Sequence, residues 1–163
     1  MIINFNDFNE LDSTDAPQAD DLHKVYTVTS LIGEEPTLSH DDQLLASKMG
    51  IVDRQVRYYK AAARILGFLD SKDCLTRAGR DLLSSQGDFM DTIVTAFQYS
   101  NIGVCWCTYY QVSSVLDVPL EITEVIKFLN YAFGANLSDS TKKRRAKTLI
   151  KWVNEYSQHI RTR

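Results

Sequence analysis

The sequence predicts a mainly α-helical fold with small β-hairpin wings, arranged as tandem winged-helix or helix-turn-helix units. Three observations support this prediction. Apolar residues recur at helical spacing in successive segments of the chain. A short strand-like stretch, GFLDSKDCLT, interrupts the helices near residue 70. In each half of the chain, a tight turn precedes a longer helix that carries several Arg or Lys residues.

The composition is typical of a globular protein. The chain has 163 residues, of which 44% are hydrophobic, and can bury a core as one domain or as two small ones. It contains no apolar run of about 18 residues, and its N-terminus lacks the basic and apolar regions of a secretion signal. We therefore expect a soluble, cytoplasmic protein that does not enter a membrane.

The charges are segregated along the chain although the net charge is only −3. The first 21 residues contain six acidic residues and no basic residue, whereas the segment from Lys142 to the end contains eight basic residues and one acidic residue, Glu155. We expect residues 1–20 to form an acidic arm that is partly disordered. One hypothesis is that this arm folds back over a basic helix and reduces non-specific binding to DNA.

Residues 21–85 form the first predicted unit. Helices are predicted over residues 21–33, 39–50, 53–67 and 77–83. Ser39 is the expected N-cap of the second helix, and Leu44, Leu45 and Met49 form its expected apolar face. Between the third and fourth helices, GFLD and CLT are predicted to pair as a hairpin around a turn at residues 71–73. This order of elements is typical of a winged helix-turn-helix.

Residues 86–163 form the second predicted unit, which ends in a long basic helix. Helices are predicted over residues 88–100 and 120–134, the latter with Ile122 among its buried residues. Helix and strand compete over residues 101–118, and we favour a helix from Thr108 to Leu116. The last helix begins with Ser138 or Ser140 as N-cap, which gives a second helix, turn and basic helix.

The basic residues at the start of the last helix indicate an anionic ligand. Cations there oppose the helix macrodipole, and a bound anion would remove this cost. The neighbouring hydroxyl and amide groups can donate to phosphate oxygens. A solvated basic face that balances the acidic arm is the alternative. The candidate DNA-contact residues are Arg54, Gln55, Arg57, Tyr58, Arg64 and Lys72 in the first unit, and Ser140, Thr141, Lys142, Lys143, Arg144, Arg145 and Lys147 in the second.

Two segments resemble a known type of domain. DRQVRYYKAAARILGFLD followed by CLTRAGRDLLSS, and later LSDSTKKRRAKTLIKWVNEY, are similar to the winged-helix DNA-recognition regions of bacterial restriction endonucleases and related defence proteins. The resemblance extends over roughly residues 21–156. It implies a module that binds double-stranded DNA, with a nuclease or other defence-system subunit as its partner. It implies contacts by Arg54, Gln55, Arg57 and Tyr58, and by Ser140, Thr141, Lys142, Arg144 and Arg145.

The sequence contains no convincing catalytic or metal centre. Asp70-Ser-Lys72 matches half of a metal-dependent nuclease motif, but this tripeptide lies in a predicted turn. Cys105-Trp-Cys107 could supply two metal ligands, but a zinc site needs about four, and the three histidines lie far away in sequence. We therefore predict no enzyme activity, no cofactor and no metal. Any nuclease activity would come from a partner.

Three functions remain open. The first is double-stranded DNA binding as the specificity or accessory part of a restriction or defence system. The second is a transcriptional regulator, which would bind a palindromic site as a symmetric dimer. The third is a protein-interaction module on a winged-helix scaffold, which the net negative charge favours. The sequence does not predict the oligomeric state.

Overall fold

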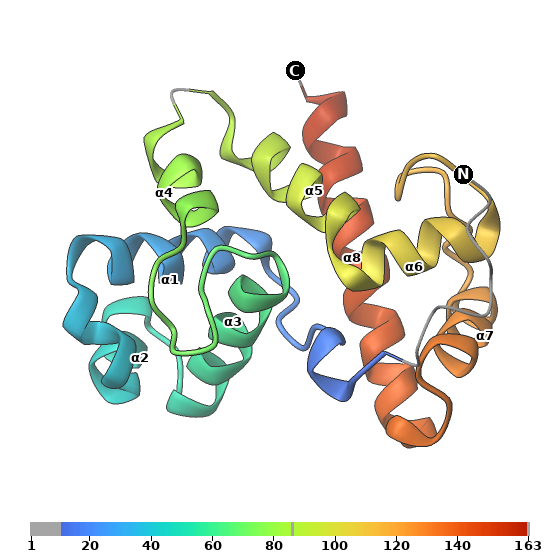
Figure 1. The fold of residues 1–163 in the computed structure, drawn as a ribbon, viewed down its shortest axis with the longest axis horizontal. Coiled ribbons are helices and arrows are strands. Elements are labelled where there is room, and N and C mark those ends of the chain that lie inside the picture. The colour runs from blue at the N-terminus through green and yellow to red at the C-terminus, as the bar shows by residue number, and fades with distance from the viewer. Residues whose placement is uncertain (1–10, 86, 163) are drawn as a thin grey trace.

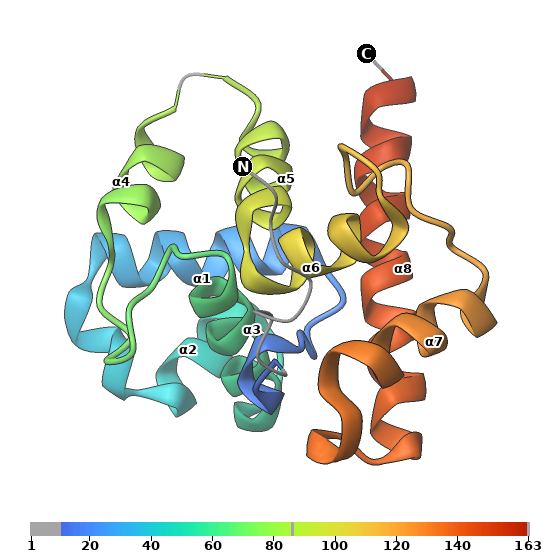
Figure 2. The same cartoon turned by 45° about the vertical axis from the view of Figure 1, so that its right-hand side comes forward.

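The structure is a computed structural model that describes residues 11–85 and 87–162. Its helices are α1 (Leu22–Glu34), α2 (Asp42–Met49), α3 (Asp53–Ile65), α4 (Arg77–Ser84), α5 (Phe89–Tyr99), α6 (Asn101–Tyr110), α7 (Ile122–Phe133) and α8 (Asp139–Arg161), with short 3₁₀ helices at Ser13–Asp15, Pro36–His40 and Gly134–Asn136. Figure 1 shows α1 to α4 on one side, α6 and α7 on the other, and α5 and α8 between them. The turned view in Figure 2 shows α8 as a long helix on the right, with α6 and α7 beside it.

Local sequence signals explain where most helices begin and end. The side chains of Asp21, Thr76 and Ser138 accept hydrogen bonds from backbone amides in the first turns of α1, α4 and α8. Gly50 ends α2 in the left-handed conformation, with a φ of 66°, which suits a residue without a Cβ atom. These caps confirm helix positions that the sequence predicts.

The buried side chains of both halves form one continuous hydrophobic core. An aromatic group occupies its centre among α5, α6, α7 and α8. The rings of Phe97 and Trp152 are in edge contact at 5.2 Å, and Trp106 stacks on Phe128 at 5.6 Å. On α3, the predicted apolar stripe is confirmed, because Val56, Tyr59, Ala63 and Leu66 are all buried.

The predicted β-hairpin wings are wrong. The described residues contain no β-strand, and Leu69 and Leu75 form only an isolated antiparallel bridge. Within this loop, the carboxylate of Asp70 accepts hydrogen bonds from the amides of Lys72 and Cys74. Thr76 already caps α4, so no residues are left to extend a strand. The described chain is all-helical. The predicted fold class of tandem winged-helix units is therefore wrong.

Three smaller predictions also differ from the structure. Ser39 is buried within a 3₁₀ helix, and Asp41 caps α2 by accepting from the amide of Leu44. Leu44 and Ile122 are exposed. The helix expected from Thr108 to Leu116 instead runs from Asn101 to Tyr110, and Gln111 ends it with a φ of 55°.

No helix within the described ranges combines the length and the apolar character that a membrane-spanning segment needs.

Candidate anion-binding cleft

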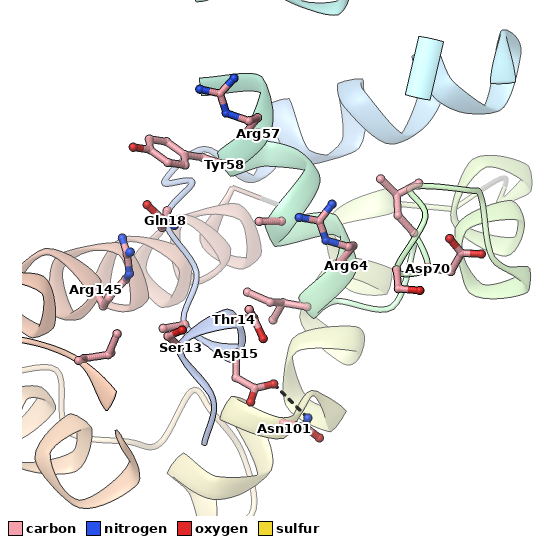
Figure 3. A pocket seen from close by; sticks show the side chains of 16 residues that line it. Ser13, Thr14, Asp15, Gln18, Arg57, Tyr58, Arg64, Asp70, Asn101 and Arg145 are labelled. Atoms are coloured by element: carbon pink, nitrogen blue, oxygen red, sulfur yellow. Dashed lines mark hydrogen bonds between the residues drawn. The ribbon is translucent and has the colours of Figure 1, made fainter. Parts of the chain in front are cut away.

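A cleft of about 850 Å³ lies where α3, α8 and the N-terminal segment meet. Figure 3 shows Arg57, Tyr58 and Arg64 on the α3 side and Arg145 on the α8 side, with residues 13–18 between them. Its lining consists of Ser13, Thr14, Asp15, Ala16, Gln18, Arg57, Tyr58, Ala61, Arg64, Ile65, Leu69, Asp70, Ser71, Asn101, Leu137 and Arg145. The cleft therefore brings together cations from two helices that are far apart in the sequence.

The α3 wall follows from the spacing of its residues. Arg57, Ala61 and Arg64 are spaced by four and three positions, so they form one stripe along the helix, away from the buried stripe. Ala61 has a small side chain, which leaves open space between the two arginines. Tyr58 lies beside this stripe, and its hydroxyl accepts a hydrogen bond from Nε of Arg54, whose guanidinium lies 5.5 Å from the centroid of the Tyr58 ring.

A buried lysine organises the charges behind this wall. Lys60 Nζ lies 2.9 Å from a carboxylate oxygen of Asp42 and 2.9 Å from one of Asp73, and it donates to the Ser39 carbonyl at 2.8 Å. Asp73 also pairs with Arg64, and Asp42 lies 4.0 Å from Arg57. The two acids thus connect the buried lysine to both cleft arginines of α3, and this network holds the arginines in position.

The α8 wall has a different charge balance. Arg145 is half-buried, and its Nε has no hydrogen-bond partner among the described residues. Burial lowers the pKa of the Arg145 guanidinium, as does the neighbouring charge of Arg144, while Tyr58 acts in the opposite direction. A partly desolvated cation without an acidic partner is costly, and an anion bound in the cleft would offset that cost.

Residues 11–20 form a segment that we name the N-terminal strap. The strap lies between α3 and α8 in both views (Figures 1 and 2). Four contacts outside the cleft hold it: Leu11 N to Ala132 O at 2.8 Å, Asn136 Nδ2 to Leu11 O at 3.1 Å, Trp152 Nε1 to Ala19 O at 2.8 Å, and Lys151 Nζ to Asp20 at 2.9 Å. The strap is thus part of the packed structure, and Ser13 to Gln18 form one wall of the cleft.

The strap bears on the hypothesis of an acidic arm that covers a basic helix. Its hydrogen bonds to α8 among the described residues are made with Trp152 and Lys151, in the middle of the helix, while Arg145 near the basic start lines the same cleft as the strap. Its Asp15 carboxylate accepts a hydrogen bond from Asn101 within the cleft. The first half of the arm, with Asp7 and Glu10, lies outside the described residues.

The remaining candidate contact residues have varied surroundings. Gln55 is exposed, and its side-chain oxygen accepts from the amide of Val52 at the start of α3. Lys142 is buried, with 6% of its surface exposed, so we leave it out of the candidate surface. Arg144 donates to the Thr141 hydroxyl at 3.2 Å. Lys72, Ser140, Lys143 and Lys147 are exposed on the loop after α3 and on the first turns of α8.

Comparison with known proteins shows one relationship. Residues 24–158 match a family described as a domain of unknown function, DUF7226. The chain belongs to the DUF7226 family. No curated protein and no solved structure matches the chain. The DUF7226 region contains both helical walls of the cleft, from Arg57 to Arg145, whereas the strap residues Ser13 to Gln18 precede it.

Several cleft residues of this DUF7226 member cannot be identified from the sequence alone. Ser13, Thr14, Gln18 and Asn101 carry no local signal, because only the tertiary fold brings them to the cleft. The role of Lys60 could be predicted from the sequence. It lies four residues after Val56, on the apolar stripe of α3, and a lysine that is buried there must find acidic partners.

The three cysteines are not among the residues that line the cleft. Cys105 and Cys107 are buried, and burial raises the pKa of Cys105 to about 11, which disfavours the reactive thiolate. Within the described part of the chain, no group of three or more His, Cys, Asp or Glu side chains is arranged to hold a metal ion.

Proposed function

We propose that this protein binds double-stranded DNA across the face that α3 and the first turns of α8 form around the cleft. The observation that carries the proposal is the convergence of Arg57, Arg64 and Arg145 on one cleft from two different helices. Arg54 and Arg144 are further exposed cations on the same two helices. Lys143 and Lys147 are also exposed, but they lie two positions before and after Arg145 and so point to the other side of α8. Positive side chains that gather on one face are the electrostatic footprint of nucleic-acid binding.

The proposed binding mode differs from that of a winged helix, because residues 11–85 and 87–162 form no wing that could contact the DNA backbone. We propose that the arginines and lysines mainly contact phosphates. Such contacts fix the position of a protein on DNA and make the affinity depend strongly on salt.

We further propose that the protein is a specificity or accessory part of a restriction or defence system, and that any nuclease activity belongs to a partner. The resemblance of the α3 and α8 segments to recognition regions of such proteins supports this context. A transcriptional regulator is distinguished by a symmetric dimer on a palindromic site.

Fluorescence anisotropy with a labelled random-sequence duplex tests DNA binding. The affinity is measured at about 50 mM and about 200 mM salt, where phosphate contacts differ strongly in strength. Two double variants are compared with the wild type: Arg54→Ala/Arg57→Ala on α3 and Arg144→Ala/Arg145→Ala on α8. We expect both to weaken binding, and each lost phosphate contact to reduce the salt slope by about 1.

Arg161→Ala is the matched control. It removes one positive charge from an exposed position on α8, roughly 24 Å along the helix from Arg145. We expect this variant to bind nearly as tightly as the wild type. An equal loss of DNA affinity in Arg161→Ala would mean that DNA is attracted by positive charge in general and not by the face around the cleft. No binding of the wild type at low salt would contradict it and favour the protein-interaction module.

A further inference from the structure

We propose that the cleft binds the terminal phosphate of a nucleotide, either a free nucleotide or the 5′ end of a nucleic-acid strand. The two sources share the same chemistry, a phosphate monoester attached to a nucleoside. This inference goes beyond duplex binding and does not depend on it. A duplex can lie across the mouth of the cleft, whereas a nucleotide would enter it.

The size and shape of the cleft support a small ligand. Its volume of about 850 Å³ lies within the range of small-molecule sites in proteins. The strap forms one wall, α3 and α8 form two others, and Asn101 at the start of α6 lies below the strap (Figure 3). A chain end or a free nucleotide suits such a recess better than a continuous duplex does.

The charge balance supports a strongly anionic ligand. Three arginines line the cleft against two acidic residues. The Asp15 carboxylate accepts from Asn101 and the Asp70 carboxylate accepts from the loop amides. Arg145 has no acidic partner within the described ranges. A phosphate monoester carries close to two negative charges and three acceptor oxygens, which match the forked donors of several arginines.

The remaining polar and aromatic residues support a nucleoside beside the phosphate. Tyr58 lies in the cleft, where its hydroxyl accepts a hydrogen bond from Arg54, whose guanidinium lies over the ring. An oriented aromatic ring next to guanidinium groups is suited to stacking of a base. Gln18 is half-buried on the opposite wall and offers an amide that can donate to and accept from a base edge.

Isothermal titration calorimetry on the full chain tests the inference with adenosine 5′-monophosphate as the probe, and with adenosine and inorganic phosphate as comparisons. We expect the monophosphate to bind at least about tenfold more tightly than either, since each lacks one half of the ligand. A second pair of probes separates the sources: a short single-stranded oligonucleotide with a 5′-phosphate and the same oligonucleotide with a 5′-hydroxyl. Preference for the phosphorylated strand without binding of the monophosphate assigns the site to strand ends.

Three variants complete the test. Arg145→Gln keeps most of the side-chain volume and removes the charge, and Arg57→Ala changes an arginine on the opposite wall whose side chain is 61% exposed. We expect the first to lose about tenfold in affinity and the second severalfold, with unchanged circular dichroism, while Arg161→Ala binds like the wild type.

Two outcomes would overturn the inference. One is the absence of any preference for the phosphorylated probes. The other is unchanged affinity for them in both Arg145→Gln and Arg57→Ala. Either result can occur while the duplex still binds. Conversely, phosphorylated probes can bind when the duplex does not. The experiments therefore distinguish failure of this inference from failure of duplex binding.

Discussion

The two cationic helices of the cleft, α3 and α8, carry their charges in different surroundings. On α3, Lys60 lies between Asp42 and Asp73, and Asp73 also pairs with Arg64. At the start of α8, neither Arg144 nor Arg145 forms an ion pair with any described residue, and the Arg144 side chain donates a hydrogen bond to the hydroxyl of Thr141. Both helices look alike as patterns of Arg and Lys in the sequence.

This difference separates structural charges from charges that are available to a ligand. On α3, Lys60 and Arg64 are closely paired with acidic residues, so they stabilise the packing of α2, α3 and the loop around Asp73. Arg54 has no acidic partner among the described residues, and Arg57 is exposed and lies 4.0 Å from Asp42. The α8 cations are unbalanced, and Arg145 is also partly desolvated. The energetic reason to bind an anion therefore lies mainly on α8.

The largest expected effect is that of Lys60→Met on stability. The variant leaves Asp42 and Asp73 without their shared buried cation and removes the donor to the Ser39 carbonyl. Breaking a buried ion pair by removing one partner costs about 3 kcal/mol or more. Urea unfolding followed by circular dichroism measures this loss.

Lys142→Met on α8 is the matched control for Lys60→Met. Lys142 is equally buried, at 6% exposure compared with 7% for Lys60, but it forms no ion pair with a described residue. We expect its free energy of unfolding to change by less than about 1 kcal/mol. Equal losses in the two variants would contradict the contrast between the helices.

A smaller effect of opposite sign is expected for Arg145→Met. Replacing a partly desolvated, unpaired guanidinium by an apolar side chain of similar length should raise the free energy of unfolding by about 1 kcal/mol in the absence of ligand. The same variant should weaken duplex binding. Thermal unfolding in a buffer without phosphate measures the first effect, and anisotropy measures the second.

Arg64→Met is the comparison on α3. It removes a partner of Asp73, so we expect a loss of stability of up to about 1 kcal/mol instead of a gain. A loss of stability in Arg145→Met would show that this side chain is already satisfied in the free protein.

The sequence predicts the helices well where the signals are local. The apolar stripe through Val56, Tyr59 and Ala63 identifies α3, and Ser138 marks the start of α8, because caps and spacing act over a few residues. Around Cys105, Trp106 and Cys107 most side chains are buried and the exposed Val104 is itself apolar, so no amphipathic period shows where α6 begins or ends. The predicted wing fails because turn chemistry at Asp70 forms a tight loop without requiring strands on either side.

The candidate site can be predicted only in part, because it too depends on contacts between residues that are far apart in the sequence. The basic character of α3 and α8 is visible in the sequence, but their convergence on one cleft depends on packing between distant segments. The same packing buries Lys142 and places Gln18 in the wall of the cleft. A pattern of charged residues indicates which helix is basic, and the tertiary structure decides which of its charges are free.

The smallest expected effect concerns the ion pair between Asp20 of the strap and Lys151 of α8. The hydrogen bond from Lys151 holds the pKa of Asp20 below its ordinary value. The stability from this pair is therefore fully present above the ordinary Asp pKa of about 3.9, and it is lost as the pH falls through the lowered pKa. Because the pair is exposed, its contribution should be below about 1 kcal/mol.

Urea unfolding of Asp20→Asn and the wild type at several pH values measures this contribution. We expect the variant to be less stable near neutral pH, and the difference to shrink toward zero in acid, because the wild-type carboxylate is then protonated as well. Asp81→Asn on α4 is the control, since the exposed Asp81 forms no ion pair with the described residues. A difference between Asp20→Asn and the wild type that persists unchanged in acid would mean that the substitution acts through something other than the charge of Asp20. No difference at any pH would mean that backbone contacts such as that of Trp152 with Ala19 hold the strap without help from this ion pair.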